Sequence, residues 1–234
     1  CRRLDGIPLA IELAAARVRL LRVDEIAARL DDSFRLLTGG SRTVLSRHQT
    51  LRALIDWSFN LLTSDERLLF LRLSVFAGGF TLPAAEAICA DDALDRAAVF
   101  DLLAQLVDKS LVVPFDTSTT EAPANDAAPV AETRYRLLET IRQYARDRLH
   151  DAGGSTAVRD RHLAFFVAMA EEAEPHFRQG DQVEWLDRLE AELDNVRAAL
   201  EWAQTTRADL GLRLTGSLFW FWHIRGHRNE GMEW

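Results

Sequence analysis

Apolar residues recur at intervals of three and four along almost the whole sequence, a spacing that places them on one face of a helix. The clearest run predicts a long amphipathic helix and consists of Leu186, Leu189, Leu193, Val196 and Leu200. An earlier run predicts another such helix and consists of Leu163, Phe166, Ala170, Ala173 and Phe177. Strands are expected only in two short segments. The pattern therefore predicts a mainly α-helical chain.

The first residues predict a rigid turn that leads directly into a helix. Gly6 can adopt backbone conformations that are closed to other residues, and Pro8 has a fixed φ that suits the first turn of a helix. An apolar stripe follows and consists of Leu9, Leu13, Ala16 and Leu20. Because a Gly-Gly turn at residues 39–40 ends the helical pattern, we expect residues 1–48 to form a helical segment of their own.

The next stretch, residues 49–152, begins with a helix that carries Leu51, Leu54, Ile55, Leu61 and Leu62, and it then has signals for three further helices in succession. Thr63 and Glu66 match a capping box, which predicts the start of a helix that extends over residues 68–76. Thr81 and Pro83 are placed to start the second helix. The third helix is expected over residues 96–109, with an apolar stripe made of Val99, Leu102, Leu103 and Leu106.

Two short strands are expected after these helices, at residues 111–113 and 135–138, and they would form a hairpin. The segment between them, Asp116 to Thr133, is rich in Thr, Ala and Pro and is poor in large apolar residues. We expect this loop to be mobile and to be cut early by a broad protease. A last helix over residues 140–151 closes the domain, and the element order is that of a winged helix.

Residues 153–234 continue as amphipathic helices, and the third of them contains four consecutive aromatic residues at positions 219–222. These aromatic residues predict core between helices. His223, His227 and Glu230 follow at spacings that a metal site could use. Gly226 interrupts that helix, however, and no catalytic carboxylate lies between the two histidines. We therefore expect no metal site at this position.

Charge and composition restrict the possible functions. The formal net charge at pH 7 is −8, and Lys109 is the only lysine among the 28 basic residues. No apolar run approaches the roughly 20 residues that a membrane-spanning helix needs. The two cysteines, Cys1 and Cys89, have neither the spacing of a metal site nor that of a disulfide framework. These features predict a cytoplasmic protein that does not enter a membrane.

Three ordered blocks of the sequence resemble a known family. Residues 1–13 are similar to the Gly-Leu-Pro-Leu-Ala segment of signal-transducing STAND ATPases, the class that includes the NB-ARC proteins. Residues 49–80 and 135–149 resemble the winged-helix part of the bacterial AfsR/LuxR-type transcriptional regulators in that class. The helices after residue 153 resemble the start of the tetratricopeptide-like (TPR-like) array that follows the winged helix in those regulators.

The resemblance implies a domain organisation: the tail of a nucleotide-proximal helical domain over 1–48, a winged helix with a flexible wing loop (116–133) over 49–152, and the start of a helical-repeat domain over 153–234. In such proteins the proline of the first block touches the base of a bound adenine nucleotide. The resemblance therefore gives Pro8 an adenine contact and places Gly6 in the same turn. ADP or ATP would bind the full-length protein, and neither would bind tightly to this chain alone.

The resemblance also implies a signalling switch. A nucleotide-binding domain upstream in the same chain would hold the winged helix in the ADP state. A protein or small-molecule inducer on the helical repeats would release it, with ATP, into a homo-oligomer. This chain contains no G-x-x-x-x-G-K-[ST] motif to hold a triphosphate, so we expect it not to be an enzyme. The family's Met-His-Asp motif falls on residues 137–139, where Leu138 cannot donate a hydrogen bond to a phosphate.

Two other functions remain open. The chain could be a helical-repeat scaffold that binds protein partners without a nucleotide, or a winged-helix regulator that binds DNA. The candidate recognition helix presents Asp101, Gln105 and Asp108, and the helix before it offers only Glu86. Major-groove recognition favours arginine, lysine, asparagine or glutamine presented together, with basic neighbours for the phosphates. We therefore expect no direct contact with nucleic acid through this region.

Overall fold

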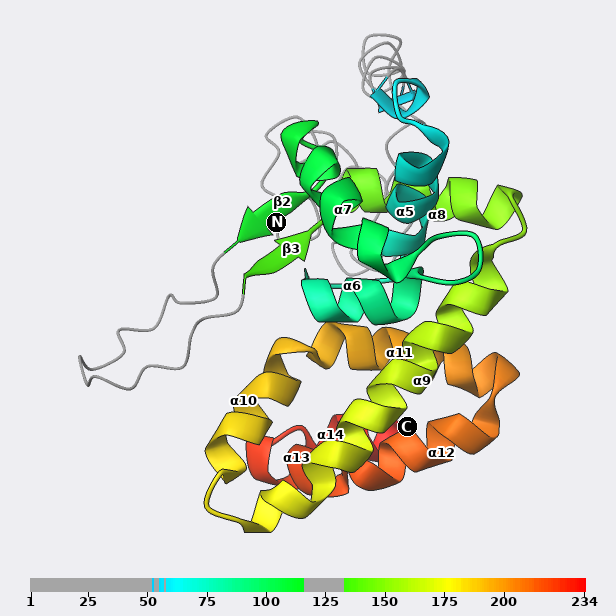
Figure 1. Ribbon diagram of the computed structural model, residues 1–234. Coiled ribbons are helices and arrows are strands. Elements are labelled where there is room, and N and C mark those ends of the chain that lie inside the picture. Colours follow the sequence, from blue (N-terminus) through cyan, green and yellow to red (C-terminus); the bar gives the residue numbers. More distant parts are fainter. Residues whose placement is uncertain (1–51, 53–54, 57, 116–132) are drawn as a thin grey trace, which may run out of the picture. The chain divides into compact units, whose positions relative to one another are not determined.

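The computed structural model describes residues 52, 55–56, 58–115 and 133–234 (Figure 1). Pro8, Gly6 and the expected helical segment 1–48 lie outside the described residues, as does the wing loop up to residue 132. The chain divides into two compact units. The first contains the described residues up to Ser74 together with 101–113 and 137–151; the second contains 75–100, the described part of 114–136, and 152–234.

In the first unit, helix α5 (Ser64–Leu73) packs against helix α8 (Glu139–Asp151). The predicted capping box at the start of α5 is confirmed. The Thr63 backbone N–H donates to Glu66 Oε2 at 2.7 Å, and the Glu66 backbone N–H donates to Thr63 Oγ1 at 3.3 Å. Two backbone N–H groups that the helix itself cannot pair are thereby satisfied, which fixes where the helix begins.

The helix α5 ends at Leu73, earlier than the predicted residue 76. The hydroxyl of Ser74 donates to the Leu71 carbonyl at 2.6 Å, and the Ser74 backbone N–H donates to the same carbonyl. These bonds close the last turn before the glycines at 78–79 are reached. The apolar face of this helix is buried and consists of Leu69, Phe70 and Leu73.

A three-stranded antiparallel sheet has the strand order β1-β3-β2, with β1 at Phe80–Thr81, β2 at Val113–Phe115 and β3 at Arg134–Arg136. Phe80 of β1 pairs with Tyr135 of β3. The expected two-stranded hairpin is therefore corrected to a sheet of three strands. Two residues are too few to give a periodic signal in the sequence, which is why β1 was not predicted.

Both expected hairpin strands are displaced from their predicted positions. Leu111 and Val112 do not start a strand, because their backbone N–H groups both donate to the Leu106 carbonyl, at 3.0 and 3.3 Å. Ser110 takes a positive φ of 58°, so these residues form a left-handed cap on helix α7 (Val99–Asp108). The second strand ends at residue 136, and Leu137 is buried beyond it.

The second unit contains helix α6 (Leu82–Cys89), which begins where the sequence predicts. Thr81 is its N-cap, and the Thr81 side chain accepts a hydrogen bond from the backbone N–H of Ala84 at 3.3 Å. Pro83 occupies the first turn, where no backbone N–H is needed. Arg161 of helix α9 (Ser155–Ala173) donates from Nε to the Ile88 carbonyl at 2.7 Å and connects α6 to α9.

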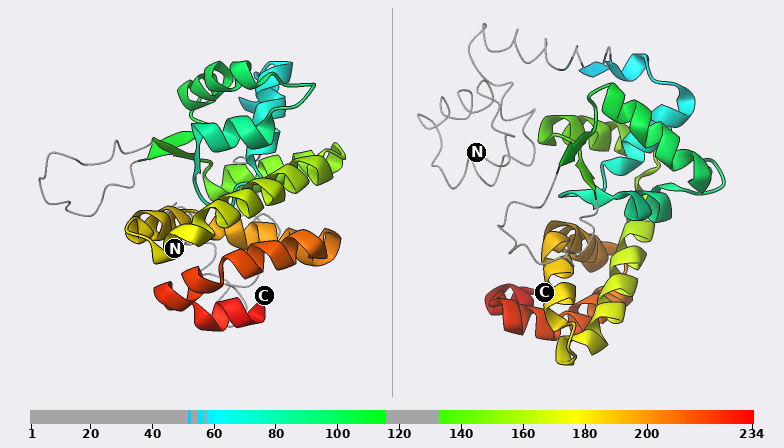
Figure 2. Two further views of the ribbon diagram at one scale, coloured as in Figure 1. Left: turned by 60° about the horizontal axis from the view of Figure 1, so that its bottom comes forward. Right: turned by 60° about the vertical axis from the view of Figure 1, so that its left-hand side comes forward.

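Helices form the rest of the second unit (Figure 2). The helix α9 (Ser155–Ala173) packs against α11 (Leu193–Thr206) and α12 (Ala208–Ser217), which also pack against each other. The other elements are η5 (Glu174–Arg178), α10 (Gln182–Ala191), α13 (Phe219–Arg225) and α14 (Arg228–Glu233). All ten apolar residues of the two predicted amphipathic runs are buried, so their assignment to the core is confirmed.

These helices are shorter than the periodic pattern predicts. The run from Leu186 to Leu200 breaks at Glu192, whose backbone N–H donates to the Leu189 carbonyl at 3.0 Å and closes α10. Gly226 ends α13 with a φ of 83°, at the predicted position.

The predicted aromatic core is confirmed only in part. Phe221 and Trp222 are buried, whereas Phe219 is 60% exposed. The mainly helical fold class is confirmed.

Candidate nucleic-acid interface

Helix α7 buries one apolar face and exposes mainly polar residues, with Phe100, 55% exposed, as an apolar exception. The predicted stripe of Val99, Leu102, Leu103 and Leu106 is buried, as expected. The exposed positions of the same helix include Asp101, Ala104, Gln105 and Asp108. The short helix η4 (Arg96–Ala98) precedes it and is capped by Asp95, which accepts from the Ala97 backbone N–H at 3.0 Å. The amide of Gln105 and the carboxylates of Asp101 and Asp108 thus lie on the exposed side of a helix whose other side is buried in the core.

The basic residue at the end of this helix is engaged within the first unit. Lys109 Nζ donates to Glu66 Oε1 and forms an ion pair with that carboxylate. Glu66 is fully buried, and burial alone would raise its pKa. The hydrogen bonds from Lys109 and from the Thr63 backbone N–H outweigh this effect, so the pKa of Glu66 lies below its usual value. Lys109 therefore neutralises a buried charge at the start of α5.

Arginines beside the sheet and at η4 have different surroundings. Arg96 is largely exposed and pairs with Glu86 at 3.3 Å. Arg136 is exposed, and its guanidinium lies 5.4 Å from the centroid of the Phe115 ring, a cation–π contact. Arg134 is instead buried and pairs with Glu192. Arg96 and Arg136 are therefore the residues of this group that water, or a phosphate, can reach.

A pocket of about 500 Å³ lies between α6 and η4 in the second unit, lined by Glu86, Ala87, Ala90, Asp91, Asp92, Asp95 and Arg96. Carboxylates dominate this lining. The surface of the pocket favours cations over phosphate groups, so the pocket itself is not a place for the nucleic-acid backbone.

The residues that align with the Met-His-Asp motif lie at the start of α8. Leu138 is half-buried, and Glu139 forms a two-point ion pair with Arg142, with N···O distances of 2.7 and 2.8 Å. The carboxylate thus occupies the first turn of a helix, where negative charge is favourable.

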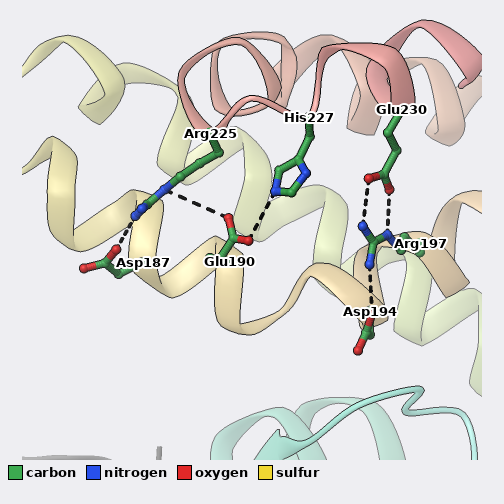
Figure 3. Close-up of polar contacts among 7 residues, drawn as sticks. All are labelled: Asp187, Glu190, Asp194, Arg197, Arg225, His227 and Glu230. Atoms are coloured by element: carbon green, nitrogen blue, oxygen red, sulfur yellow. Dashed lines mark hydrogen bonds and ion pairs between the residues drawn. The ribbon is translucent and has the colours of Figure 1, made fainter. Parts of the chain in front are cut away.

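Two of the residues considered for a metal site, His227 and Glu230, are engaged in separate contacts (Figure 3). His227 Nε2 lies 3.2 Å from Glu190 Oε1, and Glu230 pairs with Arg197. His223 Nε2 lies 3.0 Å from Nη2 of Arg228. Across the described part of the chain, no group of three or more His, Cys, Asp or Glu side chains is arranged to hold a metal ion.

A buried polar cluster in the second unit was not foreseen from the sequence. Asn195, Glu192 and Arg134 are each less than 10% exposed and are joined by hydrogen bonds. Arg134 and Glu192 are 58 positions apart in the chain, so no local motif could have revealed their pairing. Polar residues within an otherwise apolar helical run were the only signal available.

His162 lies in the same region, with its ring 4.7 Å from that of Phe166 and 5.5 Å from that of Phe76 between centroids. Its side chain is buried, and Nε2 has no hydrogen-bond partner. Burial lowers the pKa of His162 to about 3, although a hydrogen bond with Asn195 acts in the opposite direction. The imidazole is therefore neutral at physiological pH.

Comparison with known proteins gives two kinds of match. Residues 62–150 match the winged helix-turn-helix domain family. The whole chain is 47% identical to the protein named "Putative HTH-type transcriptional regulator Rv0890c" of Mycobacterium tuberculosis H37Rv, over 235 residues that make up 25% of that protein. It is also 43% identical over 163 residues to "Uncharacterized protein Rv0894" of the same strain, covering 69% of this chain and 38% of that protein.

The chain thus spans about a quarter of the length of the regulator that it matches. No solved structure matches the chain. Within the described ranges, no helix is long and apolar enough to cross a membrane.

These matches overturn the expectation that this region makes no direct contact with nucleic acid. In the helix-turn-helix motif the second helix lies in the major groove of DNA, and residues 62–150 match a family of this type. The expectation rested on Asp101 and Asp108, but a carboxylate can accept a hydrogen bond from the amino group of cytosine. Residues 62–150 therefore match a winged helix-turn-helix domain, in a chain that is 47% identical over its whole length to a mycobacterial protein bearing the name of a putative HTH-type transcriptional regulator.

Proposed function

We propose that this chain is a section of a transcriptional regulator and that its winged helix contacts DNA through the exposed face of α7. The observation that carries the proposal is the match of residues 62–150 to a winged helix-turn-helix domain. The division of α7 into a buried apolar face and an exposed polar face supports it, because a recognition helix needs both. The name of the regulator with 47% identity supports it further.

The chemistry of the exposed face indicates what it would read. The side-chain amide of Gln105 can donate and accept at once, which suits the N7 and N6 groups of adenine. Asp101 and Asp108 can accept from the N4 amino group of cytosine. Because this face is acidic, we expect few phosphate contacts and a shallow dependence of affinity on salt, with a logarithmic slope of about −2.

A selection experiment tests this proposal. A pool of random 20-base-pair duplexes is enriched on the 234-residue chain, and the enriched duplex is then titrated with Gln105→Ala. We expect Gln105→Ala to weaken binding by about tenfold, since one good base contact contributes roughly 1–3 kcal/mol. The matched control is Gln204→Ala, the same change at an exposed position of α11. If no duplex is enriched, or if both variants bind as the wild type does, α7 does not read DNA.

A second candidate is the nucleotide-dependent switch of the STAND ATPases. It is favoured by the order of elements along the chain, in which Gly6 and Pro8 precede the winged helix and a set of packed helices follows it. In this proposal the full-length protein binds ADP or ATP, and this chain contributes no enzymatic activity. An upstream domain, an inducer on the helices and a homo-oligomer are then its partners. DNA binding and a nucleotide switch are compatible in one long protein.

The switch is tested by Pro8→Ala in the full-length protein. Loss of a small apolar contact with adenine removes on the order of 1 kcal/mol, or several-fold in affinity. We expect less ADP to be retained after purification and a larger assembled fraction by light scattering. Unchanged ADP content, with an unchanged melting temperature, would exclude Pro8 from the nucleotide site.

A further inference from the structure

The segment that enters the sheet is held by one buried side chain of α11. Asn195 Oδ1 accepts from the backbone N–H of Ala77 at 2.9 Å and from that of Gly78 at 3.5 Å. Asn195 Nδ2 donates to the Gly79 carbonyl at 2.8 Å. Asn195 is 1% exposed. A single amide therefore satisfies three backbone groups of the segment that leads directly into β1.

The same turn of α11 also holds strand β3. Arg134 donates from Nη1 to Glu192 and from Nη2 to the Ala191 carbonyl at 3.2 Å. Glu192 Oε2 accepts from Asn195 Nδ2 at 2.6 Å. Both charges of this ion pair are buried, and removing either one would leave the other without compensation.

Close packing leaves the segment at residues 77–79 little freedom to move. A Cβ on Gly79 would lie 2.5 Å from Cζ of the Phe115 ring, on β2. A Cβ on Gly78 would lie 3.4 Å from Cβ of Asp194, at the start of α11. The first turn of α11 therefore lies in van der Waals contact with the segment that leads into β1.

The opposite side of the same helical turn is tied to the C-terminal helices (Figure 3). Arg197 forms a two-point ion pair with Glu230 of α14, at 2.6 and 2.8 Å, and donates to Asp194 at 3.0 Å. The hydrogen bonds from Arg197 lower the pKa of Glu230, and those bonds raise the pKa of Arg197. Neighbouring contacts of Arg225 with Asp187 and Glu190, and of His227 with Glu190, follow the same line along α10.

We propose that residues 192–197, at the start of α11, couple the position of α14 to strand β3 and to the segment that leads into β1. Glu192 binds Arg134 of β3, and Asn195 binds the segment before β1. Arg197, on the same part of the helix, binds Glu230 of α14. If α14 moves away from Arg197, the contacts of residues 192–197 with β3 and with the segment before β1 weaken, and the sheet becomes less stable. The consequence for DNA affinity rests on the proposed function, whereas the mechanical coupling does not.

Hydrogen exchange of the 234-residue chain tests the coupling. Glu230→Ala removes the ion pair of α14, and we expect amide exchange at residues 77–81 and 134–136 to become at least fivefold faster. The matched control is Glu171→Ala, which removes another two-point arginine–glutamate pair, between α9 and Arg213 of α12, at 2.8 and 2.9 Å. Exchange in the two segments should be unchanged in this control.

Two outcomes overturn the inference. Exchange that rises only within α14 shows that α11 does not transmit the change, and equal acceleration in both variants shows general loosening. Unchanged exchange in α5 and α8 checks that Glu230→Ala is folded. A titration with the enriched duplex separates the two proposals. If the strands respond but the wild type binds no DNA, the coupling stands and the proposed function fails. If DNA binds but the strands do not respond, the coupling fails alone.

Discussion

The hydroxyl of Tyr144 donates to Asp56 Oδ1 at 2.6 Å and links helix α8 to the segment that precedes α5. Arg148 Nη2 donates to the same carboxylate oxygen at 2.6 Å. The hydrogen bond from Tyr144, the largest effect, and the bonds and charge of Arg148 together lower the pKa of Asp56. Because Tyr144 is 2% exposed, its hydroxyl has no access to bulk water in place of this partner. The contact therefore contributes to the stability of the first unit.

Tyr144→Phe keeps the ring and removes the hydroxyl. We expect the free energy of unfolding at pH 7 to fall by about 1 kcal/mol, because Asp56 keeps its bond from Arg148 and is partly exposed. Urea unfolding followed by circular dichroism measures this loss, with Tyr135→Phe as the control. A loss of stability no larger than in the control would show that the hydroxyl contributes nothing.

The same variant also changes the alkaline limit of stability. Burial, followed by the hydrogen bond to Asp56, raises the pKa of Tyr144 to about 12, against roughly 10 in an unfolded chain. The contribution of the Tyr144 hydroxyl to the free energy of unfolding is complete below about pH 10. It is lost as the pH rises toward 12, because between these two pH values the unfolded state releases the proton and the folded state keeps it. The free energy of unfolding, measured at pH 9, 10 and 11, should therefore fall more steeply with pH for the wild type than for Tyr144→Phe.

The lowered pKa of His162 makes the free energy of unfolding depend on pH in the acid range. Its pKa of about 3 in the folded protein lies well below the roughly 6.5 of an unfolded chain, mainly because of burial. The unfolded state therefore binds a proton that the folded state does not, and stability falls as the pH drops below about 6.5 toward 3.

The variant His162→Gln removes this titration and keeps a polar side chain beside Asn195. Between pH 4 and 6 the slope of unfolding free energy against pH should decrease by up to about 1.4 kcal/mol per pH unit. The control His150→Gln changes an exposed histidine. Equal slopes for the wild type and His162→Gln would mean that the imidazole is not held neutral.

Lys109→Met would leave the buried carboxylate of Glu66 without its cation. We expect a loss of about 2–3 kcal/mol, below the full value for a buried pair because Lys109 is 40% exposed. Thr63→Ala, which removes only the capping oxygen, should cost about 1 kcal/mol. The double variant Glu66→Met with Lys109→Met should recover part of the loss, since it removes both charges. Urea unfolding of the four proteins decides, and a loss for Lys109→Met no greater than for Thr63→Ala would contradict this account.

The candidate interface could be found from the sequence, but its function could not be judged there. The periodic spacing of the apolar residues in α7 correctly predicted which residues are buried and left Asp101, Gln105 and Asp108 on the exposed face. The inference from their charge alone, that nucleic acid would not bind, was wrong. Net charge reports on the phosphate backbone, whereas base recognition depends on where individual donors and acceptors lie.

The sequence by itself determined the features that depend on neighbours along the chain. The capping box at Thr63 and the N-cap at Thr81 join groups three residues apart, and the buried faces of the helices follow from a spacing of three and four. The glycine that ends α13 acts through its own φ. Because both partners of such a contact are close together in the sequence, the local pattern is enough to predict it.

Only the tertiary structure decided the features whose partners are far apart in sequence. Strand β1 exists because Phe80 meets Tyr135, and Asn195 finds Ala77 across 118 positions. The buried charge of Arg134 is tolerable only beside Glu192, since an unpaired charge in the interior would cost several kcal/mol. The energy of each of these groups is set by a partner that folding brings close, and no local pattern of residues records which partner that is.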